Sequence, residues 1–475
     1  MIHSDESLTA ESLSSGLEEL WRVAGKSVAL VRQEWDPGNG TPVYTWAGRY
    51  TTRGWTEWTQ GFQYGLALLL FEATGDQELL DYGREQTMMR MAPHLTHTGV
   101  HDHGFNNVST YGNLLRFMRE GLTPGNEHEA NTYRLALKVS GAVQAARWTT
   151  LPDGLGYVPS FNGAHSLFSD TIRSMRALAV SYMLGHDLLG EQDRKISLLD
   201  RLFQHAETTA RYNVYYGTGR DSYDIRGRVV HESIFNVASG AYRCPSTQQG
   251  YAPFTTWTRG LSWILAGYPE ELEWLDTLTD QQFVSSGTTI YPSLAAAKQR
   301  FVEVSRAVAD FYLEHTPTDG VPYWDTGAPG LVHLGDYLDR PSEPCNDYEP
   351  VDGSAAAISA QGLIRLGRYL RKHGEEADGK RYESAGLTVA RTLLSHTYLA
   401  QADDHQGILL HSIYHRPNGW DYVAPGQKIP NGESSMWGDY HLMELGVMLK
   451  RMSEGKGPQT FFDIDADGSG DGASA

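Results

Sequence analysis

The chain has 475 residues, of which 40% are hydrophobic and 20% are charged, and its formal net charge is −19 at pH 7. A chain of this length can bury a large core. Its acidic balance excludes nucleic acid and anionic membrane surfaces as partners, because both repel a strongly negative protein. A polyanionic substrate would require a locally positive site.

Residues 1–20 are polar and acidic, without a basic segment followed by an apolar run, and no stretch reaches the length of a membrane span. The two cysteines, Cys244 and Cys345, form neither a disulfide framework nor a metal-ligand spacing. These features predict a cytoplasmic protein in a reducing compartment, or a periplasmic one if a leader has been removed. We expect a monomer or homodimer without a metal ion or cofactor.

Hydrophobic residues recur with helical periodicity over most of the chain, and short glycine- and proline-rich junctions interrupt the pattern. Strand-like runs are few and short, for example 212–216 and 407–414. The predicted helices, in chain order, are 17–34, 58–74, 77–91, 107–120, 127–147, 168–184, 192–209, 256–275, 293–315, 354–372, 380–396 and 434–452.

These twelve predicted helices form consecutive pairs, with glycine-containing turns after several of them. Six helical hairpins are the number that closes an all-α (α/α)6 barrel, in which the inner helices carry the site at one rim. A helical solenoid is the competing arrangement, but no repeat of about 34 or 40 residues is present. We therefore predict one catalytic barrel domain over residues 1–455.

Residues 456–475 have a different composition, rich in glycine and aspartate. The run from Asp463 to Asp471 resembles the start of an EF-hand calcium loop. Ser474 stands where that loop needs a bidentate glutamate, and no second helix follows. The composition therefore favours a disordered acidic tail.

Two acidic segments stand at the heads of predicted helices: Asp102 within residues 101–105 and Asp170 within residues 167–171. Either aspartate could be a helix N-cap. Downstream, Gln249, Trp257, Arg259 and Trp263 add amide, indole and guanidinium groups. Two carboxylates, stacking tryptophans and an arginine are typical of a site that holds and cleaves an acidic sugar, so the sequence predicts a carbohydrate-active enzyme.

The stretch from residue 211 to 260 is locally basic and contains no lysine. Arginine binds carboxylates in a bidentate manner, so this clustering favours recognition of an acidic ligand, although surface salt bridges explain any single arginine equally well. The arginines are Arg211, Arg220, Arg226, Arg228, Arg243 and Arg259, against Asp221, Asp224 and Glu232.

An ordered set of motifs resembles the site segments of unsaturated glucuronyl hydrolases, glycoside hydrolase family 88, with the unsaturated rhamnogalacturonyl hydrolases of family 105 close by. The resemblance runs from about residue 50 to 450. The motifs are Trp58-Thr-Gln-Gly-Phe, His101-Asp102-His-Gly-Phe, Phe168-Ser-Asp170-Thr, His231-Glu-Ser, Gln249-Gly-Tyr-Ala, Trp257-Thr-Arg259-Gly-Leu-Ser-Trp263, Asp352-Gly-Ser-Ala-Ala and Glu433-Ser-Ser-Met-Trp-Gly-Asp-Tyr440.

The resemblance implies an (α/α)6 barrel that acts on an acidic oligosaccharide ending in a 4,5-unsaturated uronate, the product of a polysaccharide lyase. In the family's mechanism an acid protonates C4 of the vinyl ether, water attacks C5, and the hemiketal collapses to expel the rest of the saccharide. By motif position, Asp170 is the general acid and base. Asp102 would hold sugar hydroxyls and raise the proton affinity of its neighbour by like-charge repulsion.

The remaining site roles follow from chemistry and motif position together. Trp58, Trp257 and Trp263 would stack on the sugar, although Trp263 lies within a predicted helix and could equally pack in the core. His231 and Gln249 would bind hydroxyls or the attacking water, and His101 would orient Asp102. Arg259, Ser434 and Ser435 are candidates for binding the uronate carboxylate or a substituent next to it.

Several departures from the family pattern concern the substrate more than the fold. His103 replaces an apolar residue, Asn106 and Asn107 make the next turn polar, and the loop at 217–236 is long. His101 and His103 are separated by one residue, a spacing that metal ligands can have, but no further cluster of ligand residues is adjacent. The alternative is that both are core histidines. Two other functions remain open: a two-carboxylate glycosidase for saturated uronides, and a non-catalytic sugar-binding protein on the same barrel.

Overall fold

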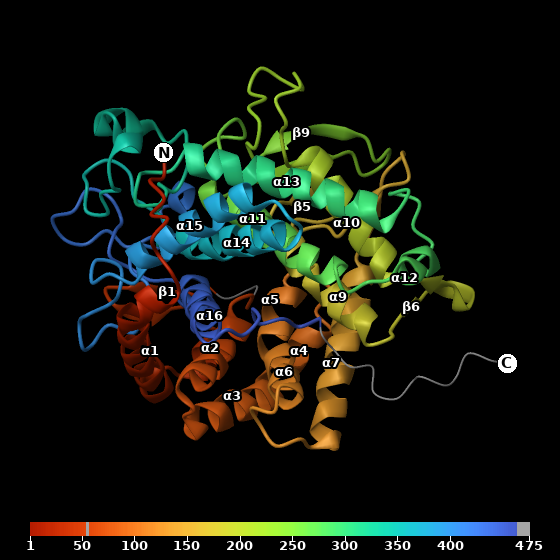
Figure 1. Cartoon of the computed structure of the whole chain (residues 1–475), viewed down its shortest axis with the longest axis horizontal. Helices are drawn as coiled ribbons and strands as arrows, with labels where there is room; N and C mark the ends of the chain where they lie inside the picture. Colours follow the sequence, from red (N-terminus) through yellow and green to blue (C-terminus); the bar gives the residue numbers. More distant parts are fainter. Residues whose placement is uncertain (54–56, 463–475) are drawn as a thin grey trace.

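The structure is a computed structural model that describes residues 1–53 and 57–462 (Figure 1). Helices dominate it, and they alternate between an inner and an outer position along the chain. The inner helices are α2 (Gln60–Thr74), α5 (His103–Asn107) with α6 (Asn113–Arg119), α8 (Thr171–Ser174) with α9 (Arg176–Met183), α11 (Thr258–Leu275), α14 (Gly353–Lys372) and α16 (Met436–Ser453).

The inner helices form a closed ring. α2 contacts α5, α5 contacts α8, α8 contacts α11, α11 contacts α14, and α14 contacts α16. α16 then returns to α2, which closes the ring between the two ends of the domain (Figure 1). The predicted (α/α)6 barrel is therefore confirmed, and the solenoid alternative is wrong.

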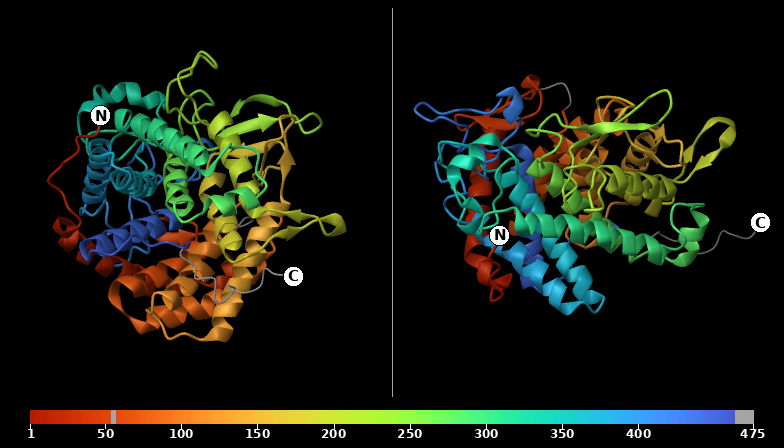
Figure 2. Two further views of the ribbon diagram at one scale, coloured as in Figure 1. Left: turned by 45° about the vertical axis from the view of Figure 1, so that its right-hand side comes forward. Right: turned by 90° about the horizontal axis from the view of Figure 1, so that it is seen from above.

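The outer helices each pack on one or two inner helices. Figure 2 shows the pairs following one another around the molecule in chain order. The outer helices are α1 (Ser14–Glu34), α3 (Gln77–Arg90), α7 (Glu127–Ala146), α10 (Leu198–Tyr212), α13 (Leu294–Glu314) and α15 (Glu376–Leu393), and two short helices, α4 (Ala92–Leu95) and α12 (Asp280–Ser285), lie in connections.

The inner helices are buried on nearly all sides. Nearly every residue of α14 is buried because the helix packs between α11 and α15. A side chain at Gly362 of α14 would lie 2.1 Å from the Leu265 carbonyl oxygen of α11, so only glycine permits this approach.

Strands are short, and nine are present in the described residues. The three-stranded antiparallel sheet β5–β8–β9 leads into the start of α8 and is the sheet that bears on the site. The strands are β1 (Tyr44–Trp46), β2 (Arg49–Thr51), β3 (Thr149–Thr150), β4 (Gly156–Tyr157), β5 (Ser166–Phe168), β6 (Leu188–Leu189), β7 (Lys195–Ile196), β8 (Glu232–Phe235) and β9 (Tyr242–Ser246).

Two helix boundaries differ from the sequence prediction for local reasons. The helix predicted at 107–120 begins at His103 and passes through a π-helical segment, Val108–Gly112, before α6. The helix predicted from 192 begins at Leu198, because residues 195–196 pair with 188–189 as a small hairpin. The strand-like runs at 212–216 and 407–414 form no strand and contribute only isolated bridges at Val214 and Leu409.

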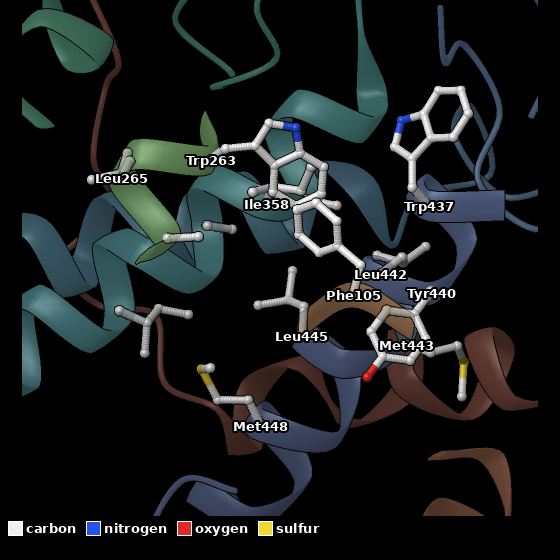
Figure 3. Packing of buried hydrophobic residues seen from close by; sticks show 14 of the residues in the cluster. Phe105, Trp263, Leu265, Ile358, Trp437, Tyr440, Leu442, Met443, Leu445 and Met448 are labelled. Carbon is white, nitrogen blue, oxygen red and sulfur yellow. The ribbon is translucent and has the colours of Figure 1, made fainter. Parts of the chain in front are cut away.

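The barrel interior has an aromatic layer near the rim and an ionic layer beneath it. Trp263 and Phe105 lie 4.9 Å apart between ring centroids, and Figure 3 shows both beside Trp437, with Leu445 below. Deeper in, Arg173 pairs with Glu270 and, at 3.1 Å, with Glu444. Burial of these charges is tolerated because each has an opposite charge within reach.

The part of the predicted tail from 456 to 462 packs against the base of the barrel. Phe461 and Phe462 are buried, and Gln459 Nε2 donates to the Glu444 carbonyl oxygen at 2.9 Å. The rest of the predicted tail, including the calcium-loop resemblance, lies outside the described residues. Within 1–53 and 57–462, no helix combines the length and apolar character needed to cross a membrane.

Candidate active site

A cavity of about 530 Å³ opens at the rim where the inner helices begin. Its size is within the range of about 300–1,000 Å³ that is usual for ligand sites. Residues from both halves of the chain line it: Trp58, His101, Asp102, Phe161, Asn162, Asp170, Gln248, Gln249, Trp257, Arg259, Trp263, Tyr414, His415, Asn418 and Trp420.

Asp102 and Asp170 face this cavity together, with His101 between them. His101 Nε2 lies 3.2 Å from Asp170 Oδ1 and 3.6 Å from Asp102 Oδ1. The two aspartates occupy the N-cap positions of α5 and α8, but neither side chain accepts a capping hydrogen bond. The capping alternative therefore does not account for these carboxylates, and their oxygens remain available to a ligand.

The Ser174 side chain links the starts of α5 and α8 by two hydrogen bonds. Ser174 Oγ donates to the His101 carbonyl oxygen, and the Gly104 N–H donates to Ser174 Oγ at 2.9 Å. A Cβ atom at residue 104 would lie 2.3 Å from the Ser174 carbonyl oxygen. Glycine in the His-Asp-His-Gly-Phe motif thus allows α5 and α8 to approach closely enough for the carboxylates to share one histidine.

The charges of this triad shift its pKa values in specific directions. Burial opposes a charged imidazole, but the Asp102 and Asp170 carboxylates outweigh it and raise the pKa of His101. Burial raises the pKa of Asp102, and repulsion from Asp170 adds to this although His101 opposes it. Burial also disfavours ionised Asp170, yet His101 outweighs it and lowers the pKa of Asp170.

The His101 imidazolium lies closer to Asp170 than to Asp102, and its charge lowers the pKa of Asp170 in the free protein in spite of burial. The unliganded triad therefore favours an ionised Asp170 beside a protonated His101.

His231 lies behind the cavity wall. Its Nδ1 accepts the backbone N–H groups of Gln248 at 3.1 Å and Gln249 at 3.4 Å, and burial lowers its pKa to about 3. The ring is therefore neutral with its proton on Nε2, and it packs 4.5 Å from both Phe168 and Trp257. His231 supports Gln248 and Gln249, which do line the cavity, and is itself absent from the lining residues.

Arg259 lines the cavity, but its terminal nitrogens are already engaged. Nη1 donates to Asp352 Oδ2 at 2.8 Å and to the Ile413 carbonyl oxygen. Nη2 donates to Gln249 Oε1 at 2.9 Å and to the Tyr414 carbonyl oxygen at 2.8 Å. The predicted bidentate grip of Arg259 on a uronate carboxylate therefore does not fit this geometry. Arg259 instead holds the side-chain oxygen of Gln249, so that the Nε2 group of Gln249 remains a hydrogen-bond donor for the cavity.

The three predicted tryptophans all reach the cavity. Trp58 stacks on Trp437 at 5.0 Å, and Trp263 lies in α11 with its ring against Phe105. Trp257 stands at the start of α11, where its ring packs on His231. Trp263 thus serves both the core and the cavity floor.

Ser434 and Ser435 are buried and do not line the cavity. Ser435 caps α16 by accepting the Gly438 N–H, and the Ser434 N–H donates to Thr45 Oγ1 at 2.8 Å. Their predicted role in carboxylate binding is therefore not supported by position. A serine before an apolar helical run is a capping signal, which is what Ser435 proves to be.

The basic stretch at 211–260 is largely structural. Arg211 pairs with Asp153, Arg226 pairs with Asp310, and Arg220 stacks on Tyr215. Arg228 is buried and donates to the carbonyl oxygens of Tyr223 and Pro253. Of the arginines in the predicted cluster, only Arg259 is among the cavity residues in the described chain.

Sequence reasoning missed the loop residues of the site. Phe161 and Asn162 belong to one loop, and Tyr414, His415, Asn418 and Trp420 belong to another. The second loop is folded by Asp421, whose carboxylate accepts the N–H groups of Tyr414 and His415. The available signal was the run of aromatic and amide residues at 414–420, but loop conformation leaves no periodicity to read.

No protein-family profile matches the chain. It is 25% identical over 415 residues to an unsaturated glucuronyl hydrolase of Formosa agariphila, an alignment that covers 83% of this chain and 80% of that protein. It is 23% identical over 416 residues to the unsaturated glucuronyl hydrolase of Bacillus sp. strain GL1, with 85% and 89% covered.

Solved structures share the fold. A crystal structure of an unsaturated glucuronyl hydrolase specific for heparin superposes with a TM-score of 0.67 at 19% identity, covering 94% of this chain and all of that one. A variant of the Streptococcus agalactiae unsaturated glucuronyl hydrolase complexed with dGlcA-GalNAc6S gives 0.60 at 18% identity, with 91% and 90% covered. The resemblance predicted from the ordered motifs is thereby confirmed: this chain is a relative of the unsaturated glucuronyl hydrolases, an enzyme of the glycoside hydrolase class.

Proposed function

We propose that this enzyme removes a 4,5-unsaturated uronic acid from the non-reducing end of lyase-generated oligosaccharides by hydrating the vinyl ether double bond. The observation that carries the proposal is the convergence of Asp102 and Asp170 on one cavity, with His101 Nε2 within 3.6 Å of both. The saccharide bound by the Streptococcus agalactiae relative supports the same substrate class.

Asp170 is the general acid and base in this proposal. Its carboxyl proton transfers to C4, which leaves a cation at C5 shared with the ring oxygen. Water then adds to C5 and gives a proton back to the Asp170 carboxylate. The C5 hemiketal opens by breaking its bond to the ring oxygen, and the hemiacetal left at C1 expels the remaining saccharide as an alcohol.

His101 supplies the proton that Asp170 lacks in the free protein. Its imidazolium lies 3.2 Å from Asp170 Oδ1, close enough for direct transfer. Binding of the sugar excludes water, which raises the pKa of the Asp170 carboxyl group and lowers that of the His101 imidazolium. The proton then moves from His101 to Asp170, while Asp102 keeps the imidazole in place.

Other cavity groups hold the sugar. Trp58, Trp257 and Trp263 offer aromatic faces, and the Gln249 amide, fixed by Arg259, donates to the substrate. His231 acts through Gln248 and Gln249, because its Nδ1 accepts their backbone N–H groups. Each of these is a binding or positioning role.

The test follows the ultraviolet absorbance of the conjugated double bond during incubation with unsaturated disaccharides from several lyases. We expect the absorbance to fall and Asp170→Asn to abolish most of that loss while ligand binding persists. Asp81→Asn, which changes an exposed aspartate on outer helix α3, is the matched control and should retain full turnover.

A saturated aryl glucuronide in the same assay separates the alternatives. Turnover of that compound, with no loss of the unsaturated chromophore, would support the two-carboxylate glycosidase and overturn the proposal. Binding of unsaturated disaccharides without any turnover, equal in wild type and Asp170→Asn, would support a sugar-binding protein instead.

A further inference from the structure

One wall of the cavity is a continuous row of aromatic side chains that leads outward from the buried floor. Trp437 is fully buried and lies 5.0 Å from Tyr414 between ring centroids. Tyr414 lies 5.4 Å from Trp420, and both rings are partly exposed cavity residues. Exposure therefore rises from Trp437 to the two cavity rings, and Trp420 is the member of the row farthest from Trp437 along these ring contacts.

Arg53 packs on Trp420 just beyond the residues that line the cavity. Its guanidinium carbon lies 5.0 Å from the Trp420 ring centroid, and its Nε donates to Tyr44 Oη at 3.0 Å. Tyr44 in turn packs 5.4 Å from Tyr414. One hydrogen bond and one stacked ring thus hold the side chain against the aromatic wall, and the residue as a whole is exposed.

The terminal nitrogens of Arg53 have no acceptor among the described residues, and no carboxylate there pairs with it. Two other arginines, Arg49 and Arg259, do have acceptors for their terminal nitrogens. Arg49, on strand β2 of the same hairpin, pairs with Glu34, and both terminal nitrogens of Arg259 are occupied. The neighbouring carboxylate of Asp421 is occupied by the N–H groups of Tyr414 and His415.

We propose that Arg53 binds an oxyanion, a sulfate ester or a uronate carboxylate, on the sugar that leaves when the unsaturated uronate is removed. The proposal rests on the function proposed above, which places the unsaturated sugar at Asp102 and Asp170. Because those groups lie at the buried end of the cavity, the leaving saccharide extends toward the mouth along the aromatic wall.

The chemistry of the position fits an oxyanion better than a neutral hydroxyl. A guanidinium presents two parallel N–H donors that match a sulfate or carboxylate edge, and stacking on an indole restricts its rotation without using those donors. The protein as a whole carries a net charge of −19, which opposes binding of an anionic saccharide. A cation at the mouth offsets this repulsion where the substituent would sit.

The experiment compares three unsaturated disaccharides that differ in the leaving sugar: an unsubstituted N-acetylhexosamine, its sulfated counterpart, and a uronate. Arg53→Ala should lower kcat/KM about tenfold for whichever anionic substrate Arg53 recognises, chiefly through KM, and should leave the neutral substrate within about twofold. Comparison of the sulfate and carboxylate substrates shows which oxyanion is bound. Added salt should weaken the wild-type preference and have little effect on that of Arg53→Ala.

Arg49→Ala is the matched control, because it removes an exposed arginine from the same hairpin whose charge is already paired. It should leave all three substrates unchanged. An equal loss on neutral and anionic substrates in Arg53→Ala, or no loss on any, would overturn the proposal for Arg53. Failure of the wild-type enzyme to turn over every disaccharide would instead overturn the proposed function.

Discussion

The two sides of the cavity are built by different means. The carboxylate side consists of the starts of α5 and α8, joined by hydrogen bonds through Ser174 and by close backbone approach at Gly104. The opposite wall, with Tyr414 and Trp420, is a loop folded around the Asp421 carboxylate. The reacting groups thus lie at helix starts with little freedom, while the aromatic groups that would contact the leaving saccharide lie on a loop, where sequence can change at lower cost.

The largest expected effect comes from breaking the proton relay on the carboxylate side. His101→Asn removes the imidazolium between Asp102 and Asp170, and we expect kcat to fall about 1,000-fold while KM changes little. His373→Asn, at the surface beside Asp276, is the control. If kcat of His101→Asn stayed within about fivefold of wild type at every pH, a proton role for His101 would be wrong.

Gly104→Ala tests whether the backbone approach of the two helix starts matters. The added Cβ would meet the Ser174 carbonyl oxygen at 2.3 Å, so α5 and α8 must separate. We expect about a 100-fold loss of kcat/KM and destabilisation of about 1–3 kcal/mol, measured by kinetics and by denaturant unfolding. Gly125→Ala, where an added Cβ has no neighbour within 4 Å, should change neither quantity appreciably.

The pH dependence follows from the direction of the triad's pKa shifts. His101 passes its proton to Asp170 in the proposed mechanism and its pKa is raised, so kcat/KM should fall on the alkaline side. This alkaline limb should lie above pH 6.5, the ordinary histidine pKa. Beyond it activity should fall about tenfold per pH unit, and His101→Asn should abolish the limb.

The raised pKa of His101 also makes the free energy of unfolding depend on pH. A histidine whose pKa is raised on folding stabilises the protein below its unfolded pKa, and this contribution is lost as the pH rises through the folded value. The free energy of unfolding should therefore decrease on the alkaline side in the wild type. If the alkaline decrease in kcat/KM persisted unchanged in His101→Asn, a group other than His101 would be responsible for it.

The loop wall should show smaller effects, and mainly on binding. Asp421→Ala removes the acceptor for the Tyr414 and His415 N–H groups, so Trp420 and Tyr414 lose their fixed positions. We expect KM to rise about fivefold with kcat within about twofold. Asp347→Ala, an exposed aspartate paired with Lys428, is the control. A larger fall in kcat than rise in KM would mean that the loop also positions the reacting groups.

Much of the fold follows from local sequence, since hydrophobic residues recur with helical periodicity and glycines mark helix ends. Gly75 and Gly185 adopt positive φ at the ends of helices, as the turn pattern predicted. The ordered motifs also placed Asp102, Asp170 and the three tryptophans in the candidate site, and all five line the cavity.

The roles of several predicted site residues depend on contacts with distant parts of the chain, which only the tertiary structure determines. Arg259 was predicted to bind substrate, yet Asp352 and two carbonyl oxygens far along the chain take its donors. Ser434 and Ser435 look like ligand groups in sequence but lie behind the wall.

His101 shows the same limit most clearly. Its neighbour Asp102 is visible in sequence, whereas its contact with Asp170 exists only because α5 and α8 cross at Gly104. The residue types and the helices are local properties of this sequence. The proton relay and the loop wall are long-range ones, because hydrogen-bond partners are chosen by the closed barrel and not by chain neighbours.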